Sequence, residues 1–534
     1  MSEERKSQAT RLVELAHGTA GLELFRNADG EAFVMLPAGT HQECWPLRGG
    51  QFRRWLAGMF YHEHGKAAGG QGVADALGVL EGEALFRGPE HEVYLRLAEN
   101  DGAIYLDLCD DLWQAIRITN TGWEVVHSPP IRFRRPRGMR PLPYPERGGS
   151  LDELREFVNV SDAEWPLLAA WVVATLRPRG PYPVLQLHGE QGSAKSTTER
   201  VVRSVVDPNV APLRSEPRDG RDLMIAAHNG WVVAYDNVSH LAPWLSDAVC
   251  RLSTGGGFAT RELFTDTDEI LIDVQRPVVM NGIEELAVRG DLLDRSIVLY
   301  LPRIDRYRAE DEFWTAFAEA QPRILGALLD AVTAALGNLA DVQLQRPPRM
   351  ADFALWAVAA EPALGLDPGA FLAAYAGNRA DAHALALETS PISDPLRVIA
   401  AEGFRGTATE LLLRLGGLVV DETVTKGRAW PKSASALSGS LRRLAPSLRA
   451  IGVEVEFDRT GPGRWIDVRT GTQNAVMPVI AVTNDSDDDG DDGDDGVSPP
   501  RSNGLAATPI SVLDLIARAS DSPRPPACPQ APDA

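Results

Sequence analysis

One eight-residue segment has the composition and spacing of a phosphate-binding loop: Gly189-Glu-Gln-Gly-Ser-Ala-Lys-Ser196. It follows a short apolar run, residues 184–187, and precedes a helix-like stretch, residues 197–206. In such a loop, turn glycines let successive backbone N–H groups surround a triphosphate, and the positive end of the next helix faces the same anion. We expect Lys195 to reach the β- and γ-phosphates and the Ser196 hydroxyl to contact Mg²⁺. The sequence therefore predicts that the chain binds ATP.

The nucleotide contacts are predicted to come from the whole loop and the residue after it: Gly189, Glu190, Gln191, Gly192, Ser193, Ala194, Lys195, Ser196 and Thr197. One position departs from the usual pattern, because Ala194 stands where a glycine normally precedes the lysine. A methyl group restricts φ at a tight turn, so a left-handed conformation at this residue would weaken nucleotide binding.

A second apolar run, residues 231–235, ends in Asp236. A carboxylate at the end of such a strand would lie beside Ser196, where it can hold a Mg²⁺-bound water. The next residue is Asn237, where a glutamate usually polarises the attacking water. An asparagine can orient water but cannot accept its proton, so the sequence leaves the general base open.

A third apolar run, residues 277–280, ends in Asn281, which suits a polar sensor that contacts the γ-phosphate or the attacking water. Arg295 stands just before a fourth run, residues 297–301. An arginine there can cross a subunit boundary and stabilise charge on the transferring phosphoryl group, and a surface ion pair is the alternative. The predicted catalytic residues are Lys195, Asp236, Asn237, Asn281 and Arg295, and the predicted Mg²⁺ ligands are Ser196 and Asp236.

The alternation of apolar runs and helical patterns predicts a multidomain α/β protein with a P-loop three-layer core. Five arginines lie between Arg132 and Arg140 of a proline-rich segment, and both a solvated linker and contact with a nucleic-acid backbone fit this charge. The predicted segments are an α+β N-terminal domain of open role (1–128), a Pro/Arg-rich linker (129–149), an ATPase core (150–305), a helical region (306–389), a C-terminal module (390–470) and a disordered acidic tail (471–534).

Composition and charge limit the classes to which this protein can belong. The chain has 534 residues and is 44% hydrophobic, which is enough for several buried cores. Its formal net charge is −21, but eight acidic residues lie in one tail segment, 485–495, so net charge says little about the folded part. The longest apolar stretch, residues 167–176, is too short to cross a bilayer, and the N-terminus lacks the apolar core of a signal peptide. We expect a cytoplasmic protein without a membrane partner.

The order of the nucleotide-binding and hydrolysis motifs resembles the AAA+ ATPases, and more narrowly the superfamily III helicases of phages, prophages and plasmids. The resemblance covers residues 150–305, and residues 252–274 are similar to that family's pore hairpin. It implies a homo-hexameric ring with ATP between subunits and single-stranded DNA drawn through the centre. The hairpin turn, residues 265–269, is acidic where the family usually has basic or aromatic residues, so Phe258 or Arg261 would take over contact with DNA.

A basic helix near the C-terminal end is a candidate for reading duplex DNA. Its apolar stripe runs from Leu437 to Ile451 at helical spacing, and Arg442 and Arg443 occupy other faces. A helix from residue 407 to 415, a loop, this helix and a hairpin with basic residues at its tip resemble a winged helix-turn-helix. A helical domain for protein contacts is the alternative. The predicted DNA-binding residues are Arg261, Arg442, Arg443, Arg459 and Arg464.

These features predict an ATP-dependent DNA helicase or translocase that acts in replication of a mobile genetic element. ATP and Mg²⁺ are the expected cofactors, and DNA is the expected partner, single-stranded in the pore and duplex at the winged helix. A primase or another replication protein would supply chemistry that this chain lacks. The alternatives are an AAA+ switch, loader or defence component that binds DNA without unwinding it, and a DNA-binding adaptor whose ATPase module is degenerate.

Overall fold

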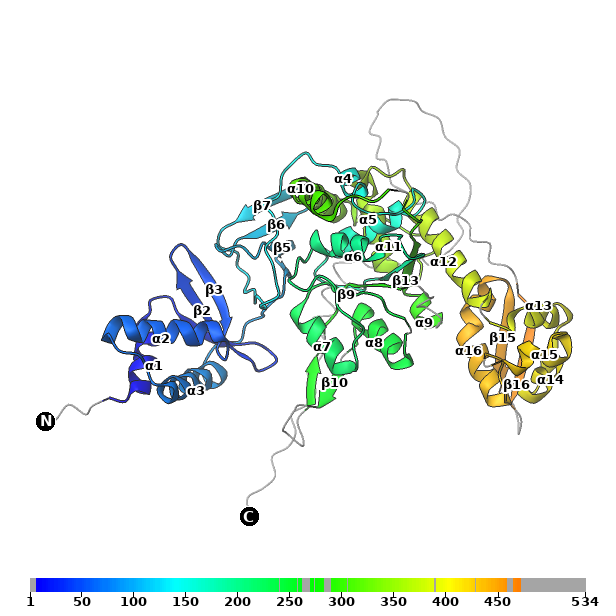
Figure 1. Ribbon diagram of the computed structural model, residues 1–534, viewed down its shortest axis with the longest axis horizontal. Coiled ribbons are helices and arrows are strands. Elements are labelled where there is room, and N and C mark those ends of the chain that lie inside the picture. The colour runs from blue at the N-terminus through cyan, green and yellow to red at the C-terminus, as the bar shows by residue number, and fades with distance from the viewer. Residues whose placement is uncertain are drawn as a thin grey trace, which may run out of the picture.

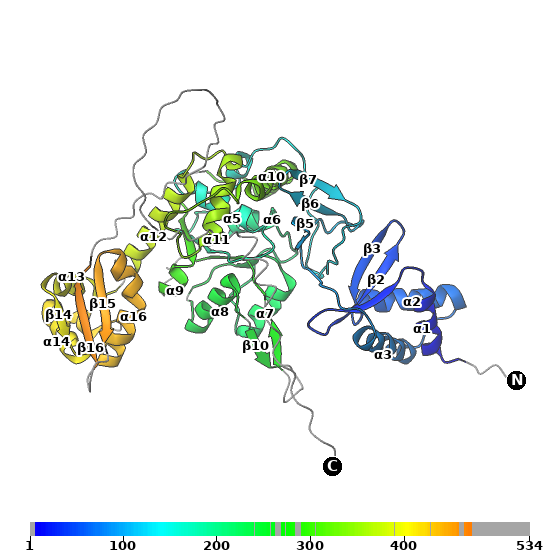
Figure 2. The ribbon, with the colours of Figure 1, turned by 180° about the vertical axis from the view of Figure 1, so that it is seen from behind.

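The computed structural model describes residues 6–471 apart from positions 240, 257, 262–268, 273, 283–289, 305, 389, 428 and 459–463. A central parallel sheet has the N-terminal helices on one side and a small C-terminal module on the other (Figure 1), and Figure 2 shows the same arrangement from behind. The predicted multidomain α/β class is therefore confirmed. The predicted tail, except Gly471, lies outside the described residues. No helix of the described part combines the length and the apolar character that crossing a bilayer requires.

The first unit packs three helices against a small antiparallel sheet, which has the order β1-β2-β3. The Ser7 side chain caps the first helix by accepting a hydrogen bond from the backbone N–H of Thr10. Leu12, Phe52 and Leu80, one from each helix, are fully buried in a shared core. The elements are α1 (Gln8–Gly18), β1 (Glu23–Arg26), β2 (Ala32–Ala38), β3 (His41–Pro46), α2 (Gly50–His64) and α3 (Gly70–Phe86).

The next sheet is antiparallel, with its strands in chain order: β4 (Leu97–Asn100), β5 (Ala103–Asp107), β6 (Ala115–Thr119) and β7 (Gly122–Val126). Apolar side chains of this sheet join the same hydrophobic core as the central module and the long helix α10 (Glu310–Asn338). The Trp123 indole also donates a hydrogen bond to Asp330 of α10, at 2.7 Å. The boundary predicted at residue 128 therefore does not coincide with a break in the core.

The central sheet is parallel, with the order β13-β8-β12-β9. Almost every residue of these strands is buried, as expected of a sheet covered on both faces. In Figure 1, α6 and α11 lie on one side of the sheet and α7 and α8 on the other. The elements are α4 (Asp152–Arg155), α5 (Trp165–Ala174), β8 (Val184–His188), α6 (Lys195–Ser204), α7 (Gly220–Asn229), β9 (Val233–Tyr235), α8 (Pro243–Thr254), β12 (Val278–Asn281), α9 (Gly290–Leu293) and β13 (Ser296–Tyr300).

A two-stranded antiparallel ribbon, β10 (Phe258–Arg261) and β11 (Glu269–Ile272), occupies the position of the predicted pore hairpin. Its tip, residues 262–268, lies outside the described residues, and so does most of the predicted acidic turn. The helical region that follows the central sheet consists of α10, α11 (Ala351–Ala360), the 3-10 helix η1 (Glu361–Leu364) and α12 (Ala370–Glu388).

The C-terminal module has the order helix, strand, helices, strand, strand, and its antiparallel sheet has the order β14-β16-β15. Thr407 and Glu410 form a capping box at the start of the second long helix. Leu437, Leu441 and Leu448 of the predicted stripe are fully buried in this module's own core. The elements are α13 (Ser393–Glu402), β14 (Phe404–Gly406), α14 (Ala408–Leu418), α15 (Glu422–Lys426), α16 (Ala434–Ala450), β15 (Val453–Asp458) and β16 (Trp465–Thr470).

The central arginines of the arginine-rich segment bind protein groups, so they are not part of a solvated linker, and contact of the segment with a nucleic-acid backbone stays a prediction. Arg132 donates to Glu23 of β1 at 3.0 Å, Arg134 donates to the carbonyl of His228, and Arg135 forms an ion pair with Asp107 at 2.5 Å. The end of the segment lies against α10 so closely that a Cβ on Gly149 would stand 2.2 Å from the carbonyl oxygen of Arg323. The prolines exclude regular structure, and these contacts hold the segment in place.

Candidate active site

The predicted phosphate loop connects the carboxyl end of β8 to the first residue of α6. Gly189 and Gly192 have φ of 145° and 88°, values that side chains rarely allow. A Cβ on Gly189 would stand 2.6 Å from both the Leu301 carbonyl oxygen and the Ser193 hydroxyl. Glycine at this position is therefore required by close packing as well as by backbone angle.

The Lys195 ammonium group lies over the loop. Its Nζ donates to the carbonyl oxygens of Gly189 at 2.7 Å and Glu190 at 2.9 Å. Burial lowers the pKa of Lys195, while the negative charge of Asp236 acts in the opposite direction. Since these bonds go to neutral carbonyls, a phosphate anion can replace them with a stronger charge-assisted contact.

Ala194, the position that departs from the glycine pattern, has φ 59° and ψ 30°, which is the left-handed conformation. An L-residue in this conformation costs about 1–2 kcal/mol, whereas a glycine adopts it without strain. The sequence expectation that a methyl group here would be strained therefore has a structural basis.

We expect Ala194→Gly to raise the free energy of unfolding by on the order of 0.5 kcal/mol, because relief of strain exceeds the added backbone freedom of the unfolded chain. Urea denaturation would measure the change. The matched control is Ala373→Gly in α12, where Ala373 is exposed within a regular helix and the substitution should lose about 1 kcal/mol. Equal losses in the two variants would contradict the assignment of strain to Ala194.

Two oxygen ligands suitable for Mg²⁺ meet at the carboxyl edge of the sheet. Ser196, in the first turn of α6, donates a hydrogen bond to Oδ1 of Asp236 at 2.7 Å. Asp236 directly follows β9, and its backbone N–H donates to the carbonyl of Arg214 at 2.8 Å. Adjacent ligands of an octahedral Mg²⁺ stand about 2.9 Å apart, since each Mg–O bond is about 2.0–2.1 Å long. The two side chains can therefore bind one ion with little movement.

Both polar atoms of the Asn281 side chain are hydrogen-bonded to protein groups. Its Oδ1 accepts a hydrogen bond from the backbone N–H of Asn237 at 3.0 Å, and its Nδ2 donates to Oδ1 of Asp236 at 2.7 Å and to Oε2 of Glu199. The side chain is only 2% exposed. In this structure Asn281 thus positions its neighbours, and the predicted sensor contact with phosphate would require it to exchange one of these bonds.

Asn237 is exposed and left-handed, with φ 55°. An asparagine tolerates this conformation better than most residues, and strained backbone of this kind is common at functional positions. It directly follows Asp236 in the chain, and an exposed amide at this position can orient a water molecule.

Glu199 is the residue of this site that the sequence interpretation missed. It is fully buried one helical turn after Lys195 and contacts Asn281. Burial and the nearby charge of Asp236 raise the pKa of its carboxyl well above the usual range. The helix after the loop is polar through most of its length, so nothing in the sequence indicated that Glu199 would be the buried carboxyl.

Beside the loop lies a cavity of 530 Å³, large enough for the base and ribose of a nucleotide. Ala194, Ser196 and Thr197 form one side of it, and Tyr307 and Trp314 contribute aromatic surface. The Arg200 guanidinium lies 3.9 Å above the Trp314 ring, which fixes both side chains. This cavity was not predicted, because residues before β8 and after β13 contribute to it together.

Arg295, the predicted finger, is engaged within its own chain. Its guanidinium forms an ion pair with Asp291 and donates to the Asp291 carbonyl at 3.0 Å. Arg349 contacts the same carboxylate at 3.0 Å. A role across a subunit boundary therefore requires Arg295 to leave Asp291, whose charge Arg349 would still neutralise.

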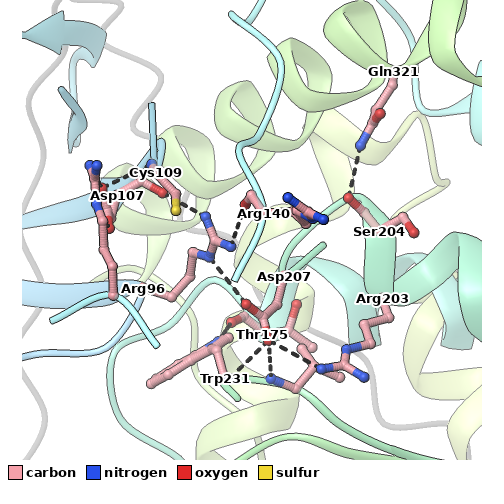
Figure 3. A network of polar contacts seen from close by, with 12 residues as sticks. Arg96, Asp107, Cys109, Arg140, Thr175, Arg203, Ser204, Asp207, Trp231 and Gln321 are labelled. Carbon is pink, nitrogen blue, oxygen red and sulfur yellow. Dashed lines mark hydrogen bonds and ion pairs between the residues drawn. The ribbon is translucent and has the colours of Figure 1, made fainter. Parts of the chain in front are cut away.

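A buried ion network lies at the far end of α6, away from the phosphate loop (Figure 3). Arg96, which is fully buried, donates to Oδ1 of Asp207 at 3.2 Å. The other carboxylate oxygen of Asp207 accepts hydrogen bonds from the backbone N–H groups of Trp231, at 2.9 Å, and Val232, at 3.1 Å. Asp207 therefore joins the β4–β7 sheet to the segment that leads into β9.

The predicted DNA-binding arginines are divided between described and undescribed positions. Arg442 and Arg443 are exposed on α16, and Arg464 is exposed just before β16. Arg442 lies 4.7 Å above the ring of Phe457 in β15, so the helix and the hairpin share one surface. Arg261 is the last residue of β10, and Arg459 lies outside the described residues.

Two family models match the chain. The model of an actinomycete integrative conjugative element replication protein matches residues 151–383, and the model of the AICE RepA C-terminal domain matches residues 394–480. Both models describe parts of replication proteins of actinomycete integrative conjugative elements, and the chain is similar to that family over these two ranges. The predicted role in replication of a mobile genetic element is confirmed at this level.

Solved structures of the NrS-1 C-terminal region are also similar to this chain. Three of them cover 86–87% of this chain and 99–100% of their own, with 9–10% sequence identity and TM-scores of 0.36 to 0.39. At these TM-scores the similarity carries no argument about fold or function. The comparison with curated proteins gave no match.

Proposed function

We propose that this replication protein is a Mg²⁺-dependent ATPase that moves or unwinds DNA of its element. The observation that carries the proposal is the hydrogen bond between Ser196 and Asp236, at 2.7 Å, with the Lys195 ammonium over the same loop. A hydroxyl, a carboxylate and a lysine in this arrangement are the groups that phosphoryl transfer to water needs for holding the metal and neutralising charge. Bound Mg²⁺ would supply the Lewis acid that polarises the γ-phosphate.

The strand order supports an AAA+ core of the kind that the sequence resembles. The strand before the phosphate loop, β8, is flanked by β13 and β12, and β9 lies beyond β12. All four strands are parallel, so Asn281, the last residue of β12, and Asp236, the residue after β9, lie at the edge where the phosphate loop begins. In parallel α/β sheets, ligands bind at this edge. A ring of subunits, proposed as a homo-hexamer, would add Arg295 from a neighbour to the γ-phosphate.

The topology of the C-terminal module supports a winged helix. A helix, a short strand, further helices and two hairpin strands follow one another, and β14 pairs with β16. In a winged helix the helix before the hairpin enters the major groove, which would be α16 with Arg442 and Arg443. Arg464 of the wing would then contact a phosphate group.

The double variant Arg442→Ala/Arg443→Ala should weaken binding to duplex DNA about tenfold and lower the salt slope of log K by about 1 for each lost phosphate contact. Fluorescence anisotropy at several salt concentrations measures both quantities. The control is Arg414→Ala on α14, an exposed arginine that pairs with Glu402. An unchanged salt slope in the double variant would place the DNA surface elsewhere.

A second function is favoured by one observation. Asp236 would serve as a metal ligand. The next residue, where ATP-hydrolysing sites usually have a carboxylate base, is Asn237. A protein with slow hydrolysis would act as a switch that binds ATP, assembles on DNA and loads a partner without unwinding.

Two measurements on the wild-type protein separate these functions. Phosphate release with ATP and Mg²⁺, with and without DNA, tests for an ATPase, and strand displacement on forked DNA tests for a motor. Turnover with displacement supports the helicase, and nucleotide-dependent DNA binding without displacement supports the switch. Failure to bind nucleotide would contradict both and leave a DNA-binding adaptor.

A further inference from the structure

Glu199 is a buried carboxyl group that the proposed mechanism does not yet use. Its side chain is fully buried between α6 and β12, and it is the second acceptor for the amide of Asn281. Its other oxygen, Oε1, has no hydrogen-bond partner in the described part of the chain. A buried polar atom without a partner costs about 1–3 kcal/mol, so a carboxyl group here calls for a functional reason.

The bonds around Asn281 show what Glu199 holds. A primary amide has two N–H donors, and those of Asn281 go to Asp236 and Glu199. With both donors fixed, the amide plane cannot rotate, and its Oδ1 stays on the backbone N–H of Asn237. The Asn281 side chain thereby fixes both Asp236, the proposed Mg²⁺ ligand, and Asn237, the residue proposed to orient the attacking water.

Removing the acceptor would free this arrangement. Without Glu199, the second N–H of Asn281 would be buried and unpaired, and a flip of the amide would place Oδ1 against the carboxylate of Asp236. Such a flip repels Asp236 and releases the N–H of Asn237. The flip reaches the loop only through Asp236, which also accepts a hydrogen bond from the Ser196 hydroxyl, and it leaves the contacts of the loop lysine in place.

We propose that Glu199 is a positioning residue for hydrolysis, which locks the amide of Asn281 and through it Asp236 and Asn237. The inference rests on the proposed ATPase function. It assigns Glu199 an effect on turnover and not on nucleotide affinity, because Lys195 and the loop amides bind the phosphates without it.

Three variants test the acceptor directly. Glu199→Met removes the acceptor at similar volume, Glu199→Gln keeps an acceptor oxygen but carries no charge, and Val202→Ala removes core packing from the same helix without touching the site. We expect Glu199→Met to lower kcat about 10- to 100-fold, as loss of a supporting bond behind a metal site does. The KM for ATP should stay within about threefold, and Glu199→Gln should restore kcat to within about threefold of the wild type.

A readout that needs no nucleotide is the hydrogen exchange of the Asn237 amide, because that N–H is held by Asn281. In nucleotide-free protein, the exchange rate of this backbone N–H should rise about tenfold in Glu199→Met and should stay unchanged in Glu199→Gln and Val202→Ala. In a double-mutant cycle, Glu199→Met should have no further effect on kcat once Asn281→Ala is present.

The outcomes distinguish the positioning role of Glu199 from the ATPase function. The wild type could turn over ATP while Glu199→Met matches Val202→Ala in kcat and in hydrogen exchange. That result would refute the positioning role and leave the ATPase function intact. Glu199→Gln as impaired as Glu199→Met would also refute it, because the charge and not the acceptor would then matter. No turnover in the wild type would refute the ATPase, and the positioning role with it.

Discussion

Lys195→Ala should lower ATP turnover by about 100-fold or more, because it removes the only ammonium group that the described structure places over the phosphate loop. In the proposed ATPase, the lysine would neutralise charge on the β- and γ-phosphates in the ground state and on the transferring phosphoryl group in the transition state. Both kcat and nucleotide affinity should therefore fall. Phosphate release and equilibrium binding of a fluorescent ATP analogue measure the two effects.

The control for this variant is Lys426→Ala, which removes a lysine that pairs with Glu422 on the surface of α15. Its turnover should equal that of the wild type. The fold should survive Lys195→Ala, since the lysine contacts only carbonyl groups and a hydroxyl of its own loop. A Lys195→Ala protein that hydrolyses ATP at the wild-type rate would move the active site away from this loop.

Asp207→Ala should lower the free energy of unfolding by about 3–5 kcal/mol, because it leaves the buried charge of Arg96 without its counter-ion. Arg96 and Asp207 are 0% and 2% exposed, so water cannot replace the lost partner (Figure 3). The backbone N–H groups of Trp231 and Val232 lose their acceptor at the same time. Urea denaturation followed by tryptophan fluorescence measures the loss.

Two further variants show which part of the Asp207 interaction matters. Asp207→Asn keeps an acceptor for the two backbone N–H groups but removes the charge, so its loss should be intermediate. Asp162→Ala breaks an ion pair with Arg155 at a side chain that is 94% exposed, and it should cost less than about 1 kcal/mol. If Asp207→Ala were no more destabilising than Asp162→Ala, the two backbone carbonyls that Arg96 also contacts would be sufficient to stabilise its buried charge.

The local part of the site could be predicted because it is encoded within short stretches of sequence. Glycine spacing and an apolar run predict a strand, a loop and a helix, and the structure has β8, the loop and α6 in that order. The contact between Ser196 and Asp236 also follows from pattern, because both residues come after strands whose carboxyl ends share one edge of the sheet. The order helix, loop, helix and hairpin was predicted from local pattern too, and the structure has α14, α16, β15 and β16 in that order.

The rest depends on contacts between distant parts of the chain, which no local pattern specifies. Arg96 lies 111 positions before Asp207, and nothing near either residue indicates the pair. The same holds for the bond from Asn281 to Glu199, which are 82 positions apart. Proline and arginine content predicted a linker at residues 129–149, but whether an arginine is solvated depends on carboxylates that other segments bring to it.

The arginines of that segment have a consequence for how the protein responds to ionic strength. Salt weakens attraction between charges that water separates by more than a Debye length of about 8 Å at physiological concentration. Arg132 and Arg135 instead contact their carboxylates directly, at 3.0 Å and 2.5 Å. A salt wash should therefore leave the ion pair between Arg135 and Asp107 intact, since the two side chains are only 12% and 1% exposed.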